Sequence, residues 1–531
     1  MENLDIIKIM KNPKFFGSDV KSVDIIQTHI SYVALTGKYA YKIKKQVNYG
    51  FLDFSTVEKR KYYCEEEMRL NRRLCSDIYL DVIPITKKNR SLELNGDGEI
   101  VDYALKMREF SQDKIMINLL KQGKICKEQI EKICDILIKF YNSEEHSKEI
   151  DRYGEPDVIK RNICENFQQT ESMIDITIPK DIYEYIKNTS SNFFKQKQDI
   201  FEKRIKNKYI KNCHGDLHSG NIVVSDEDIY IFDCIEFNKR FRYCDIASDI
   251  GFLAMDLDYM NYPYLSSNLI IKYIEKSKDF GILEMLNFYK SYRAYVRGKV
   301  IGFRLNDTKI SNDEKKDIID TTKKYFDLSE YYARLYSLDI NNNKPLIFIV
   351  GGLTGVGKST LSLKITVDYH AHLINTDVIR KELAGINIFE RHHDEVNTGL
   401  YAPERIDETY EKVIEKAVDF LKNGENVVLD ATFQKKKYRD MARRITKENN
   451  AILIPVLCVC PEDTAKKWLE RRIKTKTVSD GRWEIYTHQK KTFEPFTIEE
   501  KYIKADLSKN RYKERIDLFK KILTKVNNDV K

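Results

Sequence analysis

The chain lacks the features that mark secreted and membrane-spanning proteins. Its ten cysteines include no CxxC pair, and eight of them precede residue 250 without regular spacing. This pattern fits reduced thiols better than a disulfide framework. No apolar run approaches the ~18 residues that cross a bilayer, and the first residues lack the basic start and apolar core of a signal peptide. We therefore expect a cytoplasmic protein that contacts no membrane.

An excess of charge of one sign is also missing. The 91 basic and 82 acidic residues leave a formal net charge of +9, which is small against a mixed background, and no long basic block occurs. A weak positive bias suits polyanionic nucleotides. Proteins that bind nucleic acid typically carry a concentrated basic patch instead. Nucleic acid is therefore not the expected partner. Hydrophobic residues make up 42% of the chain, which is enough for packed cores.

Length and pattern indicate two domains. A chain of 531 residues exceeds the roughly 100–200 residues of one ordinary domain. Residues 337–345 contain three asparagines and a proline, which should end the preceding helix, and an apolar strand begins at Leu346. We predict domains at residues 1–338 and 346–531, joined by a linker at 339–345.

The two parts differ in fold class. In the first, strands at 30–45 precede a helix expected to begin near Thr56, and helical patterns dominate after Lys127. This order predicts a bilobal α+β fold with a small sheet lobe and a mostly helical lobe. The second part alternates helical patterns with strands predicted at 346–350, 372–374, 426–429 and 451–458. Such alternation predicts an α/β fold with a parallel sheet and helices on both faces.

Residues 214–221, His-Gly-Asp-Leu-His-Ser-Gly-Asn, have the Asp-to-Asn spacing of a kinase catalytic loop. In that pattern Asp216 engages the acceptor hydroxyl and Asn221 holds magnesium. The two apolar runs that follow predict a hairpin that brings Asn221 beside Asp233. Two oxygen ligands at that place predict a site for a magnesium–triphosphate complex. Glu236 is the next metal candidate after Asp233.

The sheet lobe should supply a lysine for the α- and β-phosphates and a glutamate that holds it. Strand alternation puts Lys42 and Lys44 on one face. The Ala-x-Lys form of residues 40–42 favours Lys42, with Lys44 as the alternative. Glu67 falls on the buried stripe of the following helix and is the predicted partner. Ordinary surface positions for Lys42 and Glu67 are the competing interpretation.

A second, unrelated motif matches the P-loop pattern of two glycines, a lysine and a serine. It follows an apolar strand and precedes a helix, so backbone amides would cradle phosphates at the helix start. Lys358 would contact the β- and γ-phosphates, and the Ser359 hydroxyl would bind magnesium. The predicted nucleotide-binding residues are Gly352, Leu353, Thr354, Gly355, Val356, Gly357, Lys358, Ser359 and Thr360.

Carboxylates after two later strands favour a small-molecule kinase over a motor ATPase. We expect Asp377 at the end of the strand beside the P-loop strand, facing the acceptor as base or orienter. Arg380, one helical turn later, would hold an acceptor phosphate or carboxylate. Asp430 closes the strand at 427–429, where a carboxylate that assists magnesium is expected.

A basic stretch follows the last predicted strand. It is predicted to form a lid that stabilises transition-state charge, and a solvated helix face is the alternative. The Ser-Asp-Gly at 479–481 receives no predicted role. The residues of the basic stretch are Arg471, Arg472, Lys474 and Lys476.

Residues 214–221, together with 232–238 and 245–250, resemble the aminoglycoside phosphotransferase family of protein-kinase-like enzymes. The whole chain resembles bacterial and archaeal fusions of such a domain with a P-loop ATPase or kinase domain of the polynucleotide-kinase, gluconate-kinase and zeta-toxin type. The resemblance implies two ATP sites that need Mg²⁺. It also implies that Asp245 or Asp249, both on a predicted helix, braces the catalytic loop. The sheet lobe departs from protein kinases because it has no GxGxxG loop.

The leading interpretation is a bifunctional ATP- and Mg²⁺-dependent phosphotransferase that acts on hydroxyl groups of small molecules, with one active site per domain. The alternative is a regulatory ATP-binding protein in which the P-loop domain is an ATPase switch that controls the kinase-like domain. Asp377 and Arg380 favour the kinase, because a switch has no acceptor to bind. The sequence determines neither the acceptors nor the oligomeric state.

Overall fold

The computed structural model describes residues 3–50, 52–89, 91–307, 310–341, 344–390, 398–473, 478–508 and 512–530. The chain forms two compact units, each built from separate segments. The first unit comprises Met1–Asn162, Gln198–Asp256 and Glu275–Lys278. The second unit comprises Ile163–Lys197, Leu257–Ile274 and Asp279–Lys531. The limits drawn from the sequence at 338 and 346 stay a prediction.

The first unit contains a six-stranded antiparallel sheet in the order β1-β2-β3-β6-β4-β5. Its strands are β1 Asp24–Gln27, β2 Ser31–Leu35, β3 Tyr39–Lys44, β4 Tyr79–Lys88, β5 Ser91–Leu94 and β6 Glu99–Arg108. Helix α2 (Val57–Cys75) packs on β4 and β6. Thr56 caps this helix, because its hydroxyl accepts the Lys59 N–H at 3.3 Å, as predicted.

The rest of the first unit is mostly helical. Short strands β8 and β9 pair antiparallel with Ile222 opposite Ile231, which confirms the predicted hairpin. The prediction that Asp245 is helical was wrong. Asp245 ends strand β10, and its carboxylate accepts the Ala247 N–H at 2.8 Å, so it caps the helix that follows. The elements are α1 Asn3–Met10, α3 Met116–Lys121, α4 Lys127–Ser143, α5 Lys148–Asp151, α8 Gln198–Lys206, β7 Ile210–Asn212, β8 Ile222–Val224, β9 Ile229–Ile231, α9 Lys239–Arg242 and β10 Tyr243–Asp245. Helices α6 (Pro156–Thr170) and α10 (Ile246–Tyr259) have residues in both units.

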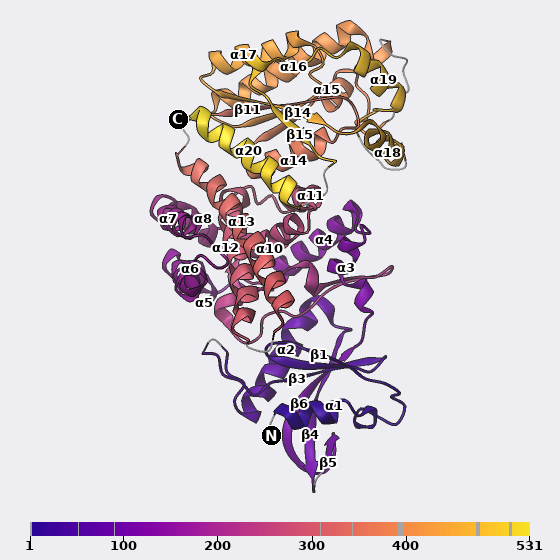
Figure 1. Cartoon of the computed structure of the whole chain (residues 1–531), viewed down its shortest axis with the longest axis vertical. Coiled ribbons are helices and arrows are strands. Elements are labelled where there is room, and N and C mark those ends of the chain that lie inside the picture. The colour runs from indigo at the N-terminus through magenta and orange to yellow at the C-terminus, as the bar shows by residue number, and fades with distance from the viewer. Residues whose placement is uncertain are drawn as a thin grey trace. The chain divides into compact units, whose positions relative to one another are not determined.

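The second unit contains the parallel sheet predicted from the alternating pattern, in the order β12-β13-β11-β14-β15. Helices α16 and α17 cover one face of this sheet, and α14 and α20 cover the other (Figure 1). The strands are β11 Leu346–Gly351, β12 His372–Asn375, β13 Val427–Asp430, β14 Ile452–Val459 and β15 Ile503–Asp506. The helices that flank it are α14 Lys358–Asp368, α15 Thr376–Leu383, α16 Pro403–Lys422, α17 Lys436–Glu448, α18 Glu462–Ile473, α19 Trp483–Thr492 and α20 Tyr512–Val530.

The strand order corrects one expectation. Strand β12, which leads to Asp377, lies beside β13 and not beside the P-loop strand β11. The reason is burial: every residue of β13 is buried, whereas His372 and Leu373 of β12 are exposed, so β12 suits the sheet edge. Asp430 of β13, and not Asp377, therefore ends a strand that lies beside β11.

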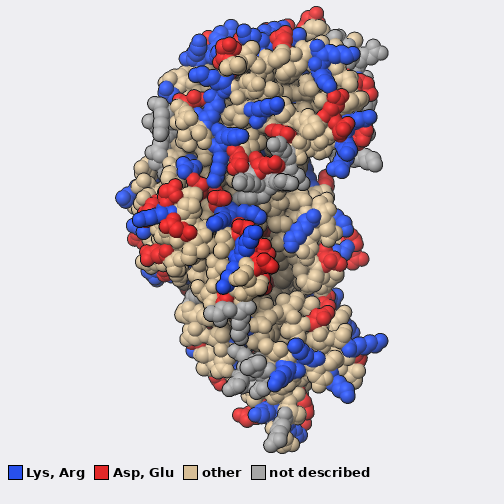
Figure 2. All heavy atoms as spheres, in the orientation of Figure 1, with Lys and Arg blue, Asp and Glu red and all other residues tan. Residues whose placement is uncertain are grey.

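The second unit also contains three helices from earlier in the chain, α7 Lys180–Gln196, α12 Ile282–Gly302 and α13 Asn312–Asn341. It contains most of a fourth, α11 Pro263–Ser277, whose last three residues belong to the first unit. Helices α12 and α13 pack along each other and carry buried aromatic side chains, such as Phe288 stacked on Phe193 with ring centroids 4.5 Å apart. On the visible face of the molecule, basic and acidic side chains are intermixed (Figure 2). Among the described residues, no helix is both long and apolar enough to span a bilayer.

Candidate active sites

A buried cluster of charges joins strand β3, helix α2 and the end of the β8–β9 hairpin in the first unit. The Lys42 Nζ lies 2.7 Å from Glu67 Oε1 and 2.7 Å from Asp233 Oδ1. The Glu67 side chain is fully buried, whereas 42% of the Asp233 side chain is exposed to solvent. Burial would lower the pKa of Lys42, but Asp233 and Glu67 raise it well above its ordinary value, so Lys42 is a permanent cation.

A second ion pair lies beneath the first and was not expected from the sequence. Lys44 contacts Glu67 Oε2 at 2.6 Å and also pairs with Glu236. Burial raises the pKa of Glu67, yet Lys42 and Lys44 outweigh it and lower that pKa to about 2. Burial raises the pKa of Glu236 in spite of Lys44. The contacts separate the two lysines: Lys44 pairs with Glu236 inside the protein, and the Lys42 ammonium is the one that reaches the exposed Asp233.

The segment 214–221 is held in place by its own side chains. The Asn221 amide donates to the Asp216 carbonyl at 3.0 Å and to the Asp216 carboxylate at 3.2 Å. His218 accepts the Gly220 N–H at its Nδ1 and presents Nε2 3.4 Å from Asp216 Oδ2. The Asp216 side chain is 36% exposed. A half-exposed carboxylate in a fixed position is suited to receive a hydroxyl group.

Two carboxylates of helix α10 hold this segment from behind. Asp249 accepts the backbone N–H groups of His214 at 2.8 Å and Gly215 at 2.9 Å. Asp256 accepts the Ser219 N–H at 2.8 Å. Asp249 is thus the residue that braces the loop, whereas Asp245 pairs with Arg204 at 2.7 Å. A fully buried carboxylate bonded to two amides fixes the backbone on which Asp216 is mounted.

The hairpin brings the predicted metal ligands to one end. The Phe232 N–H donates to the Asn221 carbonyl at 3.0 Å, so Asn221 enters the hairpin where Asp233 leaves it. Asp233 has a positive φ of 65°, and its N–H meets the Tyr79 hydroxyl at 3.2 Å. Tyr79 was not anticipated from the sequence, because no motif marks it.

The P-loop of the second unit depends on glycines. Gly352, Gly355 and Gly357 have φ values of 132°, 78° and 94°, a region that other residues rarely enter. A Cβ on Gly352 would lie 2.4 Å from the Cys458 carbonyl oxygen, which belongs to the backbone of β14 and cannot move aside. The Lys358 Nζ donates to the Leu353 carbonyl at 2.8 Å, across the loop. Two loop amides are bonded within the protein: Gly352 N–H donates to the Thr432 carbonyl at 3.0 Å, and Thr354 N–H donates to Gln489 Oε1 at 2.8 Å.

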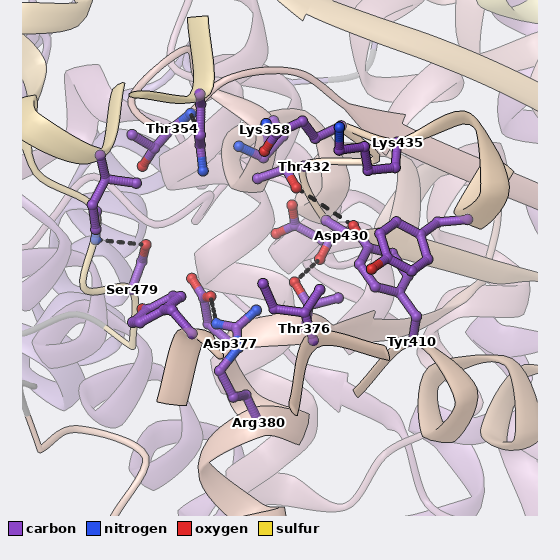
Figure 3. A pocket seen from close by; sticks show the side chains of 18 of the residues that line it. Thr354, Lys358, Thr376, Asp377, Arg380, Tyr410, Asp430, Thr432, Lys435 and Ser479 are labelled. Carbon is purple, nitrogen blue, oxygen red and sulfur yellow. Dashed lines mark hydrogen bonds and ion pairs between the residues drawn. The ribbon is translucent and has the colours of Figure 1, made fainter. Parts of the chain in front are cut away.

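A cavity of about 620 Å³ opens at the carboxyl edge of the parallel sheet. Lys358, Asp430 and Asp377 point into it from different sides (Figure 3). Burial raises the pKa of Asp430 despite Lys358, its largest opposing influence. Asn375 donates to Asp430 Oδ2 at 2.8 Å. Ser359 lines the same cavity and hydrogen-bonds Asp430, which places a hydroxyl and a carboxylate together beside Lys358.

Asp377 and Arg380 form an ion pair at 2.6 Å on the first turn of helix α15. Burial would raise the pKa of Asp377, but Arg380 lowers it, with help from the Ser479 hydroxyl and from Lys358. Arg380 also lies over the Tyr401 ring, 4.7 Å from its centroid. Asp377 therefore stays ionised and fixed in orientation on the wall opposite the P-loop.

The Ser-Asp-Gly segment, for which the sequence indicated no role, holds one wall of this cavity. Asp480 is buried and contacts Lys381 Nζ at 3.2 Å, and the Tyr401 hydroxyl donates to it at 3.3 Å. Lys381 additionally donates to the Val478 carbonyl at 2.9 Å. These bonds fix Ser479 beside Asp377. The partners are about a hundred residues apart in the chain, so no local pattern announces them.

Most of the predicted lid lies outside the described residues. Arg471 is exposed near the end of helix α18. The side chain of Arg472, together with Lys474 and Lys476, lies outside the described residues.

The donor sets fit magnesium bound with a nucleotide. Among the described residues, no group of three His, Cys, Asp or Glu side chains converges as a metal cage. Mg²⁺ does not need one, because it is commonly held by one or two protein oxygens together with substrate phosphates and waters. Asn221 and Asp233 are the residues that would offer such oxygens to a bound Mg²⁺ in the first unit, and Ser359 and Asp430 those that would do so in the second.

Comparisons with known proteins found a family match for part of the chain and a relative that spans most of it. Residues 347–496 match the family model described as AAA domain. An uncharacterized protein of Mycobacterium tuberculosis is 28% identical over 448 residues, which is 84% of this chain and 85% of the relative. A choline/ethanolamine kinase family protein from Mesorhizobium loti covers 63% of this chain and 100% of its own, with 10% identity and a TM-score of 0.37. A gluconokinase from Sinorhizobium meliloti covers 35% of this chain and 94% of its own, with 17% identity and a TM-score of 0.25. The family match confirms the resemblance to P-loop domains for the carboxyl-terminal part of the chain.

Proposed function

We propose that the chain is a bifunctional phosphotransferase that uses ATP and Mg²⁺ to phosphorylate hydroxyl groups of small molecules, with one active site in each unit. Nucleic acid is not part of this proposal. The observation that carries it is the placement of Lys358 and Asp377 on one cavity: a phosphate-binding cation and a fixed, ionised carboxylate face the same space.

The first unit would bind the α- and β-phosphates with Lys42, which Glu67 orients. Lys44 is unsuited to this role, because its ammonium is buried between Glu67 and Glu236. Asp216 would accept the hydrogen bond of the acceptor hydroxyl and take its proton as the phosphoryl group transfers. Bound magnesium would neutralise phosphate charge during this step.

In the second unit, Lys358 and the P-loop amides would hold the phosphates. Asp377 would aim the acceptor hydroxyl, and its lowered pKa favours an orienting role over that of a strong base. Space for an acceptor extends beyond the P-loop, since Tyr401, Tyr410 and Lys435 line the same cavity. An ATPase switch would not need this region, so the cavity favours the kinase.

The test is a screen of sugars, nucleosides, amino alcohols and aminoglycosides with labelled ATP. Asp216→Asn should abolish transfer to one set of acceptors, and Lys358→Ala should abolish transfer to another. Each variant should leave the other activity at the wild-type level, because the two sites share no residue. Loss of both activities in either single variant would contradict two independent active sites.

ATP turnover without an acceptor separates the kinase from the switch. A kinase hydrolyses ATP slowly when no hydroxyl compound is present, and its turnover rises on addition of the acceptor. Brisk acceptor-independent hydrolysis that depends on Lys358 would instead support the ATPase switch.

A further inference from the structure

A second cavity lies on the other side of the P-loop. It measures about 240 Å³, and Gly355 and Gly357 line both this cavity and the larger one. The P-loop is therefore a shared wall. A cavity this small is below the roughly 300–1,000 Å³ of a whole ligand pocket, so it suits one end of a ligand whose other end lies across the P-loop.

The lining of the second cavity is mostly apolar and includes an aromatic ring. Trp468 comes within 3.5 Å of the point where a Cβ on Gly357 would lie, so its indole borders the P-loop directly. The hydroxyl-bearing Thr360 is among the few polar residues of the wall. Flat aromatic ligands stack on such rings, and scattered polar groups bond to their edges. The apolar members of the wall are Pro263, Leu361, Trp468, Leu507 and Phe519.

One wall comes from a helix that precedes the P-loop sequence by about ninety residues. Pro263 is the first residue of α11 and is buried, and helices α11, α14, α18 and α20 meet here (Figure 1). Lys364 of α14, which also lines the cavity, pairs with Asp258 Oδ2 at 3.4 Å and with Asp368 at 2.5 Å. Asp258 lies in α10, just before α11, so this connection fixes the segment that leads into α11 against the helix that carries Lys358.

The connection is rigid because its charges are buried and balanced. Asp258 also accepts from Lys290 at 2.7 Å and from the Tyr332 hydroxyl at 2.5 Å. Asp368 accepts from the Tyr331 hydroxyl at 2.5 Å. Burial would lower the pKa of Lys364, but Asp258 and Asp368 raise it, so both ion pairs stay charged. Separating the end of α10 from α14 would leave unpaired charges in an apolar interior.

We infer that the second cavity binds the nucleoside end of the triphosphate held by the P-loop, with Trp468 stacked on the base and Pro263 of α11 closing the site. The inference rests on the proposed function of the P-loop as a nucleotide site. It adds that the carboxyl-terminal site is composite, because Pro263 belongs to its nucleotide-binding wall. The cavity selects for a flat heteroaromatic base and not for the phosphates.

Trp468 provides the test, because the chain has only two tryptophans. In the full-length Trp483→Phe variant, Trp468 is the sole indole. Mg-ADP should change its fluorescence saturably, and Lys358→Ala should abolish the change. Inorganic tripolyphosphate, which has no base, should leave the emission unchanged yet shift the ADP titration to higher concentration by competing for the P-loop. Equal responses to tripolyphosphate and ADP would overturn the inference.

Substitutions test the same point by affinity. Trp468→Ala should weaken ADP binding roughly 5- to 150-fold through lost stacking and leave tripolyphosphate binding unchanged, whereas Trp483→Ala should affect neither. Pro263→Glu is compatible with a first helical turn and should weaken ADP binding roughly tenfold, because the base would desolvate the new carboxylate.

The outcomes separate the two claims. If labelled ATP shows no Lys358-dependent binding, the proposed function and the inference both fail. If ATP binds through Lys358 while Trp468→Ala and Pro263→Glu bind ADP as the wild type does, the nucleoside lies elsewhere and only the inference fails.

Discussion

Asp377→Asn is the substitution that most directly tests the acceptor role in the second unit. The change keeps the shape of the side chain and removes its charge. Asp377 pairs with Arg380 at 2.6 Å, and its pKa is lowered, so the wild-type carboxylate is ionised at neutral pH. Without that charge the acceptor hydroxyl loses its orienting partner, and we expect kcat to fall roughly 10²- to 10⁴-fold.

The affinity for ATP should not fall in the same variant. Lys358 contributes to the lowered pKa of Asp377, which means that the two groups attract each other. Removing the carboxylate therefore frees Lys358 for phosphate, and the ATP affinity should stay the same or rise slightly. Lys358→Ala, in contrast, should lose both binding and transfer. The Asp233→Ala background restricts Mg-ATP binding to the second site, so a nucleotide titration can be compared there with a turnover assay.

The pH profile adds an independent check on Asp377. A carboxylate with a lowered pKa keeps its charge as the pH falls, until the pH reaches that lowered pKa. Asp377 should therefore cause no loss of carboxyl-terminal activity between pH 8 and roughly pH 4, the ordinary aspartate range. The acceptor assignment is wrong if Asp377→Asn weakens Mg-ATP binding as much as Lys358→Ala does, because the carboxylate would then serve the metal.

Three further predictions concern the remaining site residues. Lys42→Met should abolish amino-terminal transfer with little loss of stability. Lys44→Met should lower the free energy of unfolding by roughly 3–5 kcal/mol, because it leaves buried Glu67 and Glu236 short of a cation. Chemical denaturation beside a transfer assay separates the two variants, and equal stability losses would contradict the distinction. Asp233→Ala should lose amino-terminal transfer and keep carboxyl-terminal transfer, and retained amino-terminal transfer would move the metal site to Glu236. Gly352→Ala should abolish Lys358-dependent ATP binding, because the new Cβ would lie 2.4 Å from a backbone oxygen. Gly385 also has a positive φ, 69°, but open space around it. The control Gly385→Ala should therefore bind ATP normally and lose roughly 1–2 kcal/mol of stability.

The parts that the sequence predicted well are those whose geometry is set by neighbours in the chain. The P-loop shape follows from where glycines permit positive φ, and the hairpin after Asn221 follows from two apolar runs around a turn. Glu67 could be selected over other glutamates because helical periodicity alone puts it on the buried face of α2. In each of these cases a local rule decides the outcome before any tertiary contact forms.

Features set by distant contacts could not be predicted in this way. The Lys44–Glu236 pair joins residues 192 positions apart, and nothing near either residue indicates the other. The place of β12 at the sheet edge depended on a comparison of burial between strands, which motif spacing does not contain. The roles of Asp480 and Lys381 became visible only when the fold brought them together.

The two sites fix their phosphate-binding cation in different ways, and this difference has a consequence. In the first unit Lys42 is oriented by a buried carboxylate that Lys44 also needs, so charge, position and stability are coupled. In the second unit Lys358 extends across a glycine loop and bonds to a backbone carbonyl, so its position depends on main-chain geometry. Substitution of Lys44, the buried cation that Glu67 also binds, should therefore change folding and transfer together. Around the second site, substitutions that alter main-chain geometry, such as those of the P-loop glycines, should change folding and transfer together. A change of side-chain charge at Asp377 should alter transfer alone.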